Sequence, residues 1–245
     1  MSHTGQADWQ QLLYRRLSAI TDLPEAEFAH IHELVHSVHS LARDEDVREV
    51  RGTVAVVAAG WCARYRLLAD GRRSVFNIWL PGDMINLTPL TPSPECQNAA
   101  LRRADLVLIP DVHYRQLCER SPALVAAFAA SERMDSLLLA NQVLRLGRLT
   151  AYERIAHFLL EIWDRLCLVG MANEGGFESA LTQNVLADVL GLTSVHINRT
   201  LARLREEELI EVDRREVRLL DVPRLAEIAE YDPIGAEAKK RIALY

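Results

Sequence analysis

The stretch from Thr182 to Arg205 reads TQNVLADVLGLTSVHINRTLARLR and decides the fold of the C-terminal region. Thr182 is a good N-cap for a short helix over 183–190. Gly191 can end that helix, because glycine readily adopts left-handed backbone angles. Thr193 is a second N-cap residue, so another helix is expected to begin directly after it. The pattern predicts two short helices joined by a tight turn.

The spacing of three residues in this stretch is typical of a DNA-binding helix-turn-helix. Ala187 is small enough to let the two helices approach, Gly191 makes the turn, and Ile197 packs back into the angle between the helices. The small core is completed by Leu186, Leu190, Leu192 and Leu201. The alternative is a helical hairpin with a solvated charged face; the caps and the strands expected next favour the DNA-binding motif.

The outer face of the second helix has the residue types that read DNA bases. The chain has a net charge of −6, yet no acidic residue lies between Thr193 and Arg205, so the positive charge is local. Arginine pairs with guanine, asparagine pairs with adenine, and a valine methyl can meet the thymine methyl. The expected DNA contacts of this helix are Thr193, Ser194, Val195, His196, Asn198, Arg199 and Arg203.

A β-hairpin, or wing, is predicted after this helix. The apolar runs at 209–212 and 217–220 flank the polar turn Asp213-Arg214-Arg215-Glu216. Arg214 and Arg215 would lie at its tip, where we expect them to contact backbone phosphates. The predicted partner is therefore double-stranded DNA.

The preceding regions predict an α+β protein. Residues 1–40 have helical periodicity, and residues 41–120 contain short apolar runs separated by turn signals. Asp70-Gly71 between two such runs is a hairpin signal. Regularly spaced short strands indicate an antiparallel β-roll or jelly roll.

A long helix is predicted from Pro122 to about Leu146, with Ser121 as its cap and Gly147 as its end. Along this helix, apolar residues recur at alternating steps of four and three, with one polar residue, Asn141, among them. This pattern suggests the seam of a coiled coil. An ordinary core helix is the alternative. The seam would comprise Ala123, Ala127, Ala130, Met134, Leu137, Asn141 and Leu144.

These features together resemble the Crp/Fnr family of bacterial transcription regulators. The resemblance rests on the helix-turn-helix and wing, on 152–160 (YERIAHFLL), on Gly60 and 66–73 (RLLADGRR), and on 80–83 (LPGD). It covers about residues 50 to 233.

The resemblance implies a cytoplasmic regulator, not an enzyme, that binds a palindromic operator as a homodimer. It also implies three parts: N-terminal helices with a β-roll sensor-like domain (1–120), a dimerisation helix (121–147) and a winged helix-turn-helix domain (148–245). RNA polymerase would be a further partner of an activator, but the sequence identifies no surface for it.

The chain departs from the cyclic-AMP-binding members of that family. Their Gly-Glu pair corresponds to Asn86-Leu87 here, and their phosphate-binding Arg-Ser pair corresponds to Gln97-Asn98. Leu139 and Ala140 stand where the long helix would contact the purine. Because a cyclic phosphate needs a guanidinium partner, we predict no cyclic-nucleotide binding and no cofactor; the effector is not specified.

The recognition helix also differs from many relatives. Arg199 matches the base-contacting arginine of the family, whereas Val195 stands where many relatives have an acid. An acid accepts from cytosine and valine cannot, so a different target sequence is expected.

A rival motif lies near the N-terminus. His32-Glu33-Leu34-Val35-His36 matches the HExxH pattern of zinc proteases, which on a helix places both imidazoles on one face with Glu33 as base. A catalytic zinc needs a third protein ligand, for which Glu45 or Glu49 would be candidates. We interpret the segment as a histidine-rich helix without a metal. The alternatives are a zinc hydrolase, or a metal or haem sensor that uses His30, His32, His36 and His39.

Composition sets the remaining expectations. Residues 1–11 are polar and do not resemble a signal peptide, and no run of about 18 apolar residues suggests a membrane span. The four cysteines form no CxxC pair, so neither a zinc nor an iron–sulfur site is expected. No catalytic residue is assigned.

Overall fold

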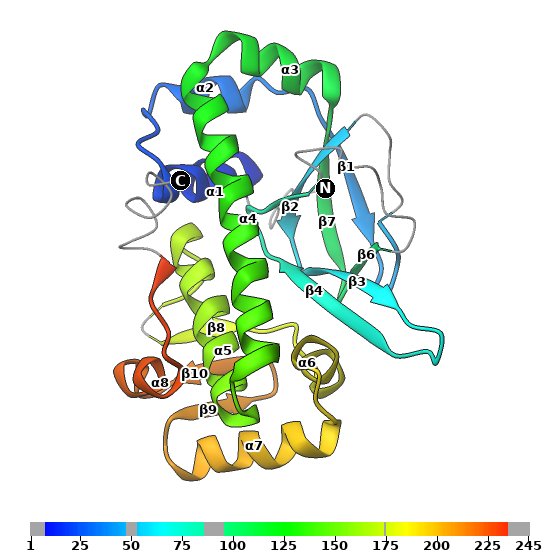
Figure 1. Cartoon of the computed structure of the whole chain (residues 1–245). Coiled ribbons are helices and arrows are strands. Elements are labelled where there is room, and N and C mark those ends of the chain that lie inside the picture. The colour runs from blue at the N-terminus through cyan, green and yellow to red at the C-terminus, as the bar shows by residue number, and fades with distance from the viewer. Residues whose placement is uncertain (1–7, 48–52, 86–95, 174, 235–245) are drawn as a thin grey trace.

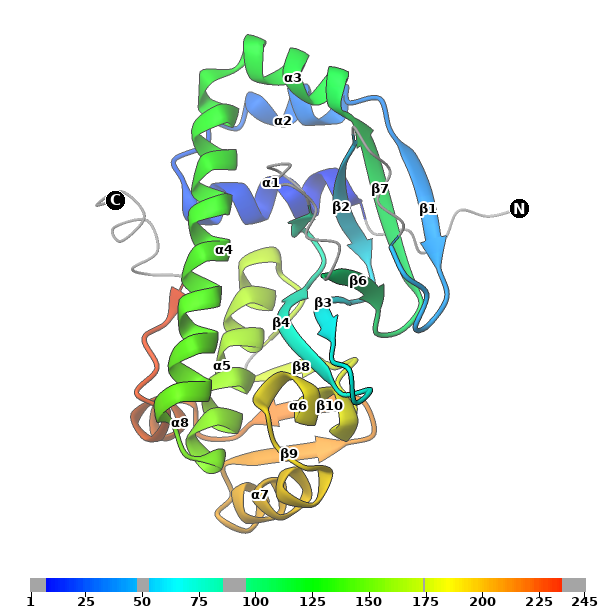
Figure 2. The same ribbon diagram turned by 45° about the vertical axis from the view of Figure 1, so that its right-hand side comes forward.

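The computed structural model describes residues 8–47, 53–85, 96–173 and 175–234, and has an α+β fold arranged along one long helix (Figure 1). This helix, α4 (Pro122–Arg148), extends past the N-terminal helices and the β-roll to the C-terminal helices. Figure 2 shows α1 extending from α4 to strand β2, and it packs against both. The α+β prediction is confirmed.

The β-roll, as far as it is described, consists of two antiparallel sheets with strand orders β1-β7-β2-β5 and β4-β3-β6. Its strands are β1 (Ser37–Leu41), β2 (Thr53–Ala59), β3 (Cys62–Leu67), β4 (Arg73–Trp79), β5 (Met84–Ile85), β6 (Gln97–Ala100) and β7 (Ala104–Pro110). The hairpin predicted at Asp70-Gly71 is confirmed, because β3 and β4 pair antiparallel on either side of it. Gly71 has a φ of +85°, which is the backbone angle that favours glycine in such a turn.

Short helices cover one end of the β-roll: α1 (Trp9–Ile20), α2 (Glu27–His32) and α3 (Asp111–Arg120). The prediction that the helical region extends to residue 40 is wrong, because β1 begins at Ser37. All five residues of β1 pair with β7, from Ser37 opposite Leu108 to Leu41 opposite Ala104. A ladder with a distant strand therefore overrides the local helical pattern.

The helical HExxH motif is also wrong as a structure. Helix α2 ends at His32, and Glu33 is its C-cap, so His32 and His36 do not share a helix face. The His36 ring packs edge-on against Trp9, and its Nδ1 lies 2.9 Å from the Leu34 carbonyl oxygen. In the described part of the chain, no group of three His, Cys, Asp or Glu side chains is suited to hold a metal ion.

The long helix begins as predicted and ends slightly later. The Ser121 hydroxyl accepts from the Leu124 amide at 3.0 Å, which confirms the cap. The predicted end at Gly147 is wrong, because α4 includes Gly147 and Arg148 and stops where Leu149 adopts an extended backbone. Thr150 then caps α5, so the chain direction changes two residues after the expected position.

The first half of the predicted seam of α4 is buried within the chain. Ala127, Ala130 and Met134 are fully buried within their own chain. Ala130 and Met134 pack with Ile20 of α1 and Ile234 near the end of the described chain. The core-helix alternative therefore holds for the first half of this face, whereas Leu137 and Asn141 are partly buried and Leu144 is exposed.

The described part of the C-terminal region combines helices with a three-stranded sheet of order β8-β10-β9. Its elements are α5 (Ala151–Val169), β8 (Gly176–Glu178), α6 (Gln183–Leu190), α7 (Ser194–Glu206), β9 (Ile210–Asp213), β10 (Glu216–Leu219) and α8 (Val222–Ala229). One hydrophobic core joins this region to the β-roll, since Trp61 and Ile78 cluster with Ile155 and Phe158 of α5. Among the described residues, no helix is both long and apolar enough to cross a lipid bilayer.

Candidate nucleic-acid interface

Helices α6 and α7 form the predicted helix-turn-helix. The Thr182 hydroxyl accepts from the Val185 amide, and the Thr193 hydroxyl accepts from the His196 amide, both at 3.2 Å. Gly191 ends α6 with a φ of +62°, and its amide bonds to the Ala187 carbonyl oxygen. Ile197 is fully buried in the angle between the two helices. The caps, the turn and the small core are therefore as the sequence predicts.

The first two turns of α7 present a polar, solvent-exposed face. Val195 is 77% exposed, and Thr193, His196, Asn198 and Arg199 are exposed as well. Ser194 is half-buried, because its hydroxyl donates to the Asn184 side-chain oxygen at 3.1 Å. The exposed face lies opposite the buried Ile197 and Leu201, so it is free to approach another molecule.

Two of the three arginines of α7, Arg203 and Arg199, have different surroundings. Arg203 Nε donates to Glu207 at 2.7 Å, and the Arg203 guanidinium lies 4.3 Å from the centre of the Tyr152 ring. Tyr152 also donates to Glu207, and it and Arg203 lower the pKa of that carboxyl. Arg199, by contrast, has no ion pair or side-chain hydrogen bond with any described residue.

The wing is formed by β9 and β10, whose register places Asp213 opposite Glu216. Arg214 and Arg215 are therefore the two residues of the connecting loop, and both are exposed. Arg214 has a φ of +48°, in the left-handed region that an arginine rarely adopts. The wing prediction is confirmed as a structure.

The structure adds a third strand that the sequence analysis missed. Strand β8 pairs with β10, and the Ser179 amide donates to the Arg215 carbonyl oxygen at 2.6 Å. Strand β8 has only three residues, and such a short run gives no periodic signal in the sequence. The segment that follows α5 therefore adds a third strand to the wing, on the side of β10 that faces away from β9.

Other residues that support the interface were also missed. Asn184 holds Ser194, while Tyr152 and Glu207 hold Arg203. Glu207 lies four residues after Arg203, a spacing that identifies helical ion pairs in a sequence. The contact of Tyr152 with the same pair depends on the packing of α5 against α7 and has no local signal.

Helix α6 is held by contacts with the β-roll and with helix α5. Arg73 on β4 pairs with Asp188 at 3.1 Å, and Arg154 on α5 donates to the Leu190 carbonyl oxygen at 3.1 Å. The last carbonyl groups of a helix lack partners within the helix, so the Arg154 contact also completes the end of α6. The helix-turn-helix is therefore packed against the β-roll as well as α5.

Of the two residues that the resemblance aligns with the phosphate-binding Arg-Ser pair, Asn98 is buried and Gln97 is exposed. The Asn98 side chain is buried and accepts from Trp79 Nε1 at 3.1 Å, and Gln97 is exposed at the end of β6. Neither supplies a guanidinium. Leu139 and Ala140 are both exposed on α4, and the Asn86-Leu87 position lies outside the described residues.

Comparison with known proteins identifies relatives of the whole arrangement. A model of the Crp-like helix-turn-helix domain matches residues 153–228. The transcriptional activatory protein AadR of Rhodopseudomonas palustris is 30% identical over 188 residues, which is 74% of this chain and 75% of AadR. The nitrogen fixation regulation protein FixK of Rhizobium meliloti is 31% identical over 170 residues, covering 68% of this chain and 72% of FixK.

A solved structure shows the same architecture. FixK2 from Bradyrhizobium japonicum superposes with a TM-score of 0.71 and 27% identity, over 81% of this chain and all of that one. The likeness includes the β-roll and the long helix as well as the C-terminal domain, because the match covers most of both chains. Together with the exposed face of α7 and the wing, these relatives show that the chain belongs to the Crp/Fnr family of DNA-binding transcription regulators.

Proposed function

We propose that this regulator binds a palindromic duplex as a homodimer, with one α7 of each protomer in successive major grooves about 34 Å apart. The observation that carries the proposal is the exposed face of α7, on which Arg199 has no described partner. Asn198 and Arg199 would read adenine and guanine, and Val195 would contact a thymine methyl. Thr193, Ser194 and His196 would lie at the groove edge.

The wing would fix the position of the protein along the duplex. Arg214 and Arg215 are exposed at the end of the β9–β10 loop, where they would bind phosphate oxygens. Arg203 would join them only by exchanging its hydrogen bond to Glu207 for a phosphate. We therefore assign base reading to Arg199 and backbone binding to the wing.

The dimer would form along the exposed apolar face of α4. Leu139, Val143 and Leu146 follow one another at steps of four and three, and all three are exposed in the single chain. This spacing is that of a two-stranded coiled coil. The face lies opposite the buried Ala130 and Met134, so it replaces the seam that the sequence suggested.

Regulation would not depend on a cyclic nucleotide, since Gln97 and Asn98 offer no charged partner for a cyclic phosphate. A calorimetric titration that gave tight, stoichiometric binding of cyclic AMP would contradict this. The chain would act by binding rather than by catalysis, as its relatives are transcription regulators. If it is an activator, RNA polymerase would be a further partner.

Three parts would carry these roles: the β-roll with its helices (1–120), the dimerisation helix (121–147) and the DNA-binding domain (148–245). A change in the β-roll would alter the relative orientation of the two recognition helices through α4. The turn at Leu149 would be the hinge, because the helix ends there.

Selection of bound duplexes from a random DNA library tests the proposal directly. Wild type should enrich an inverted repeat, and Arg199→Ala should lose or relax one position in each half-site. Arg224→Ala is the matched control, because Arg224 lies on α8 and pairs with Glu227. The control should select the same repeat as wild type. Enrichment of an identical repeat by Arg199→Ala would contradict the assignment of that residue to base reading.

A further inference from the structure

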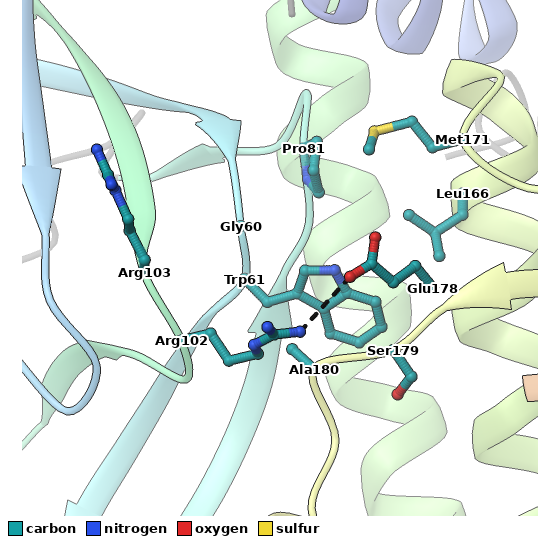
Figure 3. Close-up of a pocket in the computed structure, with 10 residues that line it drawn as sticks. All are labelled: Gly60, Trp61, Pro81, Arg102, Arg103, Leu166, Met171, Glu178, Ser179 and Ala180. Carbon is teal, nitrogen blue, oxygen red and sulfur yellow. Dashed lines mark ion pairs between the residues drawn. The ribbon is translucent and has the colours of Figure 1, made fainter. Parts of the chain in front are cut away.

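A cavity of about 270 Å³ lies between the β-roll and the DNA-binding domain, away from the interior of the β-roll (Figure 3). One wall comes from the turns of the β-roll and the other from the end of α5 and from β8. The residues that matter here are Trp61, Pro81, Arg102, Leu166, Met171 and Glu178. The cavity is slightly smaller than the roughly 300–1,000 Å³ of pockets for drug-sized ligands, which indicates a smaller occupant.

Two opposite charges form an ion pair at the wall of this cavity. Arg102 Nη1 lies 3.6 Å from Glu178 Oε1, and their side chains are 32% and 75% exposed. A long, solvated ion pair of this kind contributes little to stability. Both charges are therefore available to a ligand that offers each of them a better-placed partner.

Most of the remaining lining is apolar. Figure 3 shows the indole of Trp61 behind the ion pair, with Leu166, Met171 and Pro81 beside it. Trp61 is buried and stacks on Phe177 with ring centres 6.4 Å apart, so its position is fixed by both domains. Arg103 also lines the cavity, but its side chain points away from the indole in Figure 3.

We propose that this cavity is an effector site for a free α-amino acid with an apolar side chain. Arg102 would bind the carboxylate, Glu178 the ammonium group, and Trp61 with Leu166 and Met171 the side chain. A simple anion would meet the Glu178 carboxylate, and a simple cation would meet the Arg102 guanidinium. A ligand that has an ammonium group and a carboxylate on the same carbon atom satisfies both residues at once.

The site is connected directly to the wing. Glu178 lies opposite Glu216 in the antiparallel β8–β10 ladder. The next residue, Ser179, donates its amide to the Arg215 carbonyl oxygen. A ligand that separates Arg102 from Glu178 would therefore move the strand that holds Arg215. This consequence rests on the proposed function, whereas occupancy of the cavity does not.

Isothermal titration calorimetry of the full chain with L-leucine, L-methionine and L-phenylalanine tests the site. At least one of them should bind one per chain, with a Kd below about 1 mM. Isopentylamine and 4-methylpentanoate, which each keep only one of the two charges of leucine, should bind at least about tenfold more weakly than leucine.

Matched variants separate this site from other binding. Arg102→Gln and Glu178→Gln should each weaken binding about tenfold or more, and Arg103→Gln should leave it unchanged. Their melting temperatures without ligand report whether they fold. Absence of saturable heat with all three amino acids, or unchanged binding by both variants, would overturn the site. Library selection without amino acid tests DNA binding separately, so the two failures are distinguishable.

Discussion

The side chain of Gln142 on α4 donates to the backbone carbonyl oxygen of Val189 on α6, at a distance of 2.5 Å. The same amide nitrogen lies 3.3 Å from the Val75 carbonyl oxygen on β4, and the side-chain oxygen accepts from Arg145. Val189 lies in the last turn of α6, where carbonyl groups lack helical partners. One buried amide thus joins the long helix, the β-roll and the helix-turn-helix.

Gln142→Leu should destabilise the folded chain by about 1–3 kcal/mol, because two buried carbonyl groups and a guanidinium lose a partner. Urea denaturation of wild type and variant measures this difference. Arg148→Ala, an exposed change near the end of the same helix, should stay within about 0.5 kcal/mol. An equally stable Gln142→Leu would mean that water or a rearranged side chain replaces the amide.

His157 should make the protein less stable in mild acid. Burial, and then the Arg145 guanidinium, lower the pKa of His157 from its usual 6.5 to about 4. Between these two pH values the unfolded chain takes up a proton that the folded chain excludes. Stability therefore falls as the pH decreases from 6.5 to 4, by at most about 3 kcal/mol from this group.

His157→Gln removes this titration, so its free energy of unfolding should depend less steeply on pH within the same window. Urea denaturation at several pH values across that window measures both slopes. Titrating groups that do not interact with His157 contribute equally to wild type and variant and cancel in the comparison. Parallel curves for the two proteins would show that His157 does not titrate as described.

Val143→Glu should give a monomer. Val143 and Leu139 are 66% and 51% exposed on the same face of α4, and two helices that meet there would bring the two introduced carboxylates together. Sedimentation velocity measures the oligomeric state. Val112→Glu on α3, where the valine is 56% exposed, introduces the same charge elsewhere and should leave the dimer intact. A dimeric Val143→Glu would place the interface on another surface.

The helix-turn-helix was predictable because its determinants are local. Thr182, Gly191 and Thr193 act within three or four residues of their own positions, and Ile197 packs within the same short motif. The wing follows the same rule, since its two strands are adjacent in sequence. Such elements are specified by caps, turns and alternation, which a single sequence displays.

Local signals do not predict which face of α4 is buried and which is exposed. The helix has two stripes with steps of four and three, one through Ala130 and Met134 and one through Leu139 and Val143. Which stripe becomes buried depends on two distant parts of the chain, Ile20 near its beginning and Ile234 near its end. The prediction of helical structure for the residues of strand β1 is wrong for a related reason, because the partner strand β7 is remote in sequence.

Arg214 offers a test in which stability and DNA binding should change in opposite directions. Its φ of +48° lies in a region that costs a non-glycine residue about 1–2 kcal/mol, and asparagine tolerates it better. The two-residue loop between β9 and β10 would favour Asn or Gly at this position. An arginine kept under strain at an exposed tip is explained if its charge binds phosphate.

Arg214→Asn should therefore be as stable as wild type or up to about 1 kcal/mol more stable, yet bind the selected operator more weakly. The slope of log K against log salt concentration should decrease in magnitude by about one, because one phosphate contact is lost. Fluorescence anisotropy over a series of salt concentrations measures this slope. Arg218→Asn is the control on the same wing, since Glu216 and Glu211 already pair with Arg218. A weaker Arg214→Asn with an unchanged slope would mean that the residue shapes the wing without contacting phosphate.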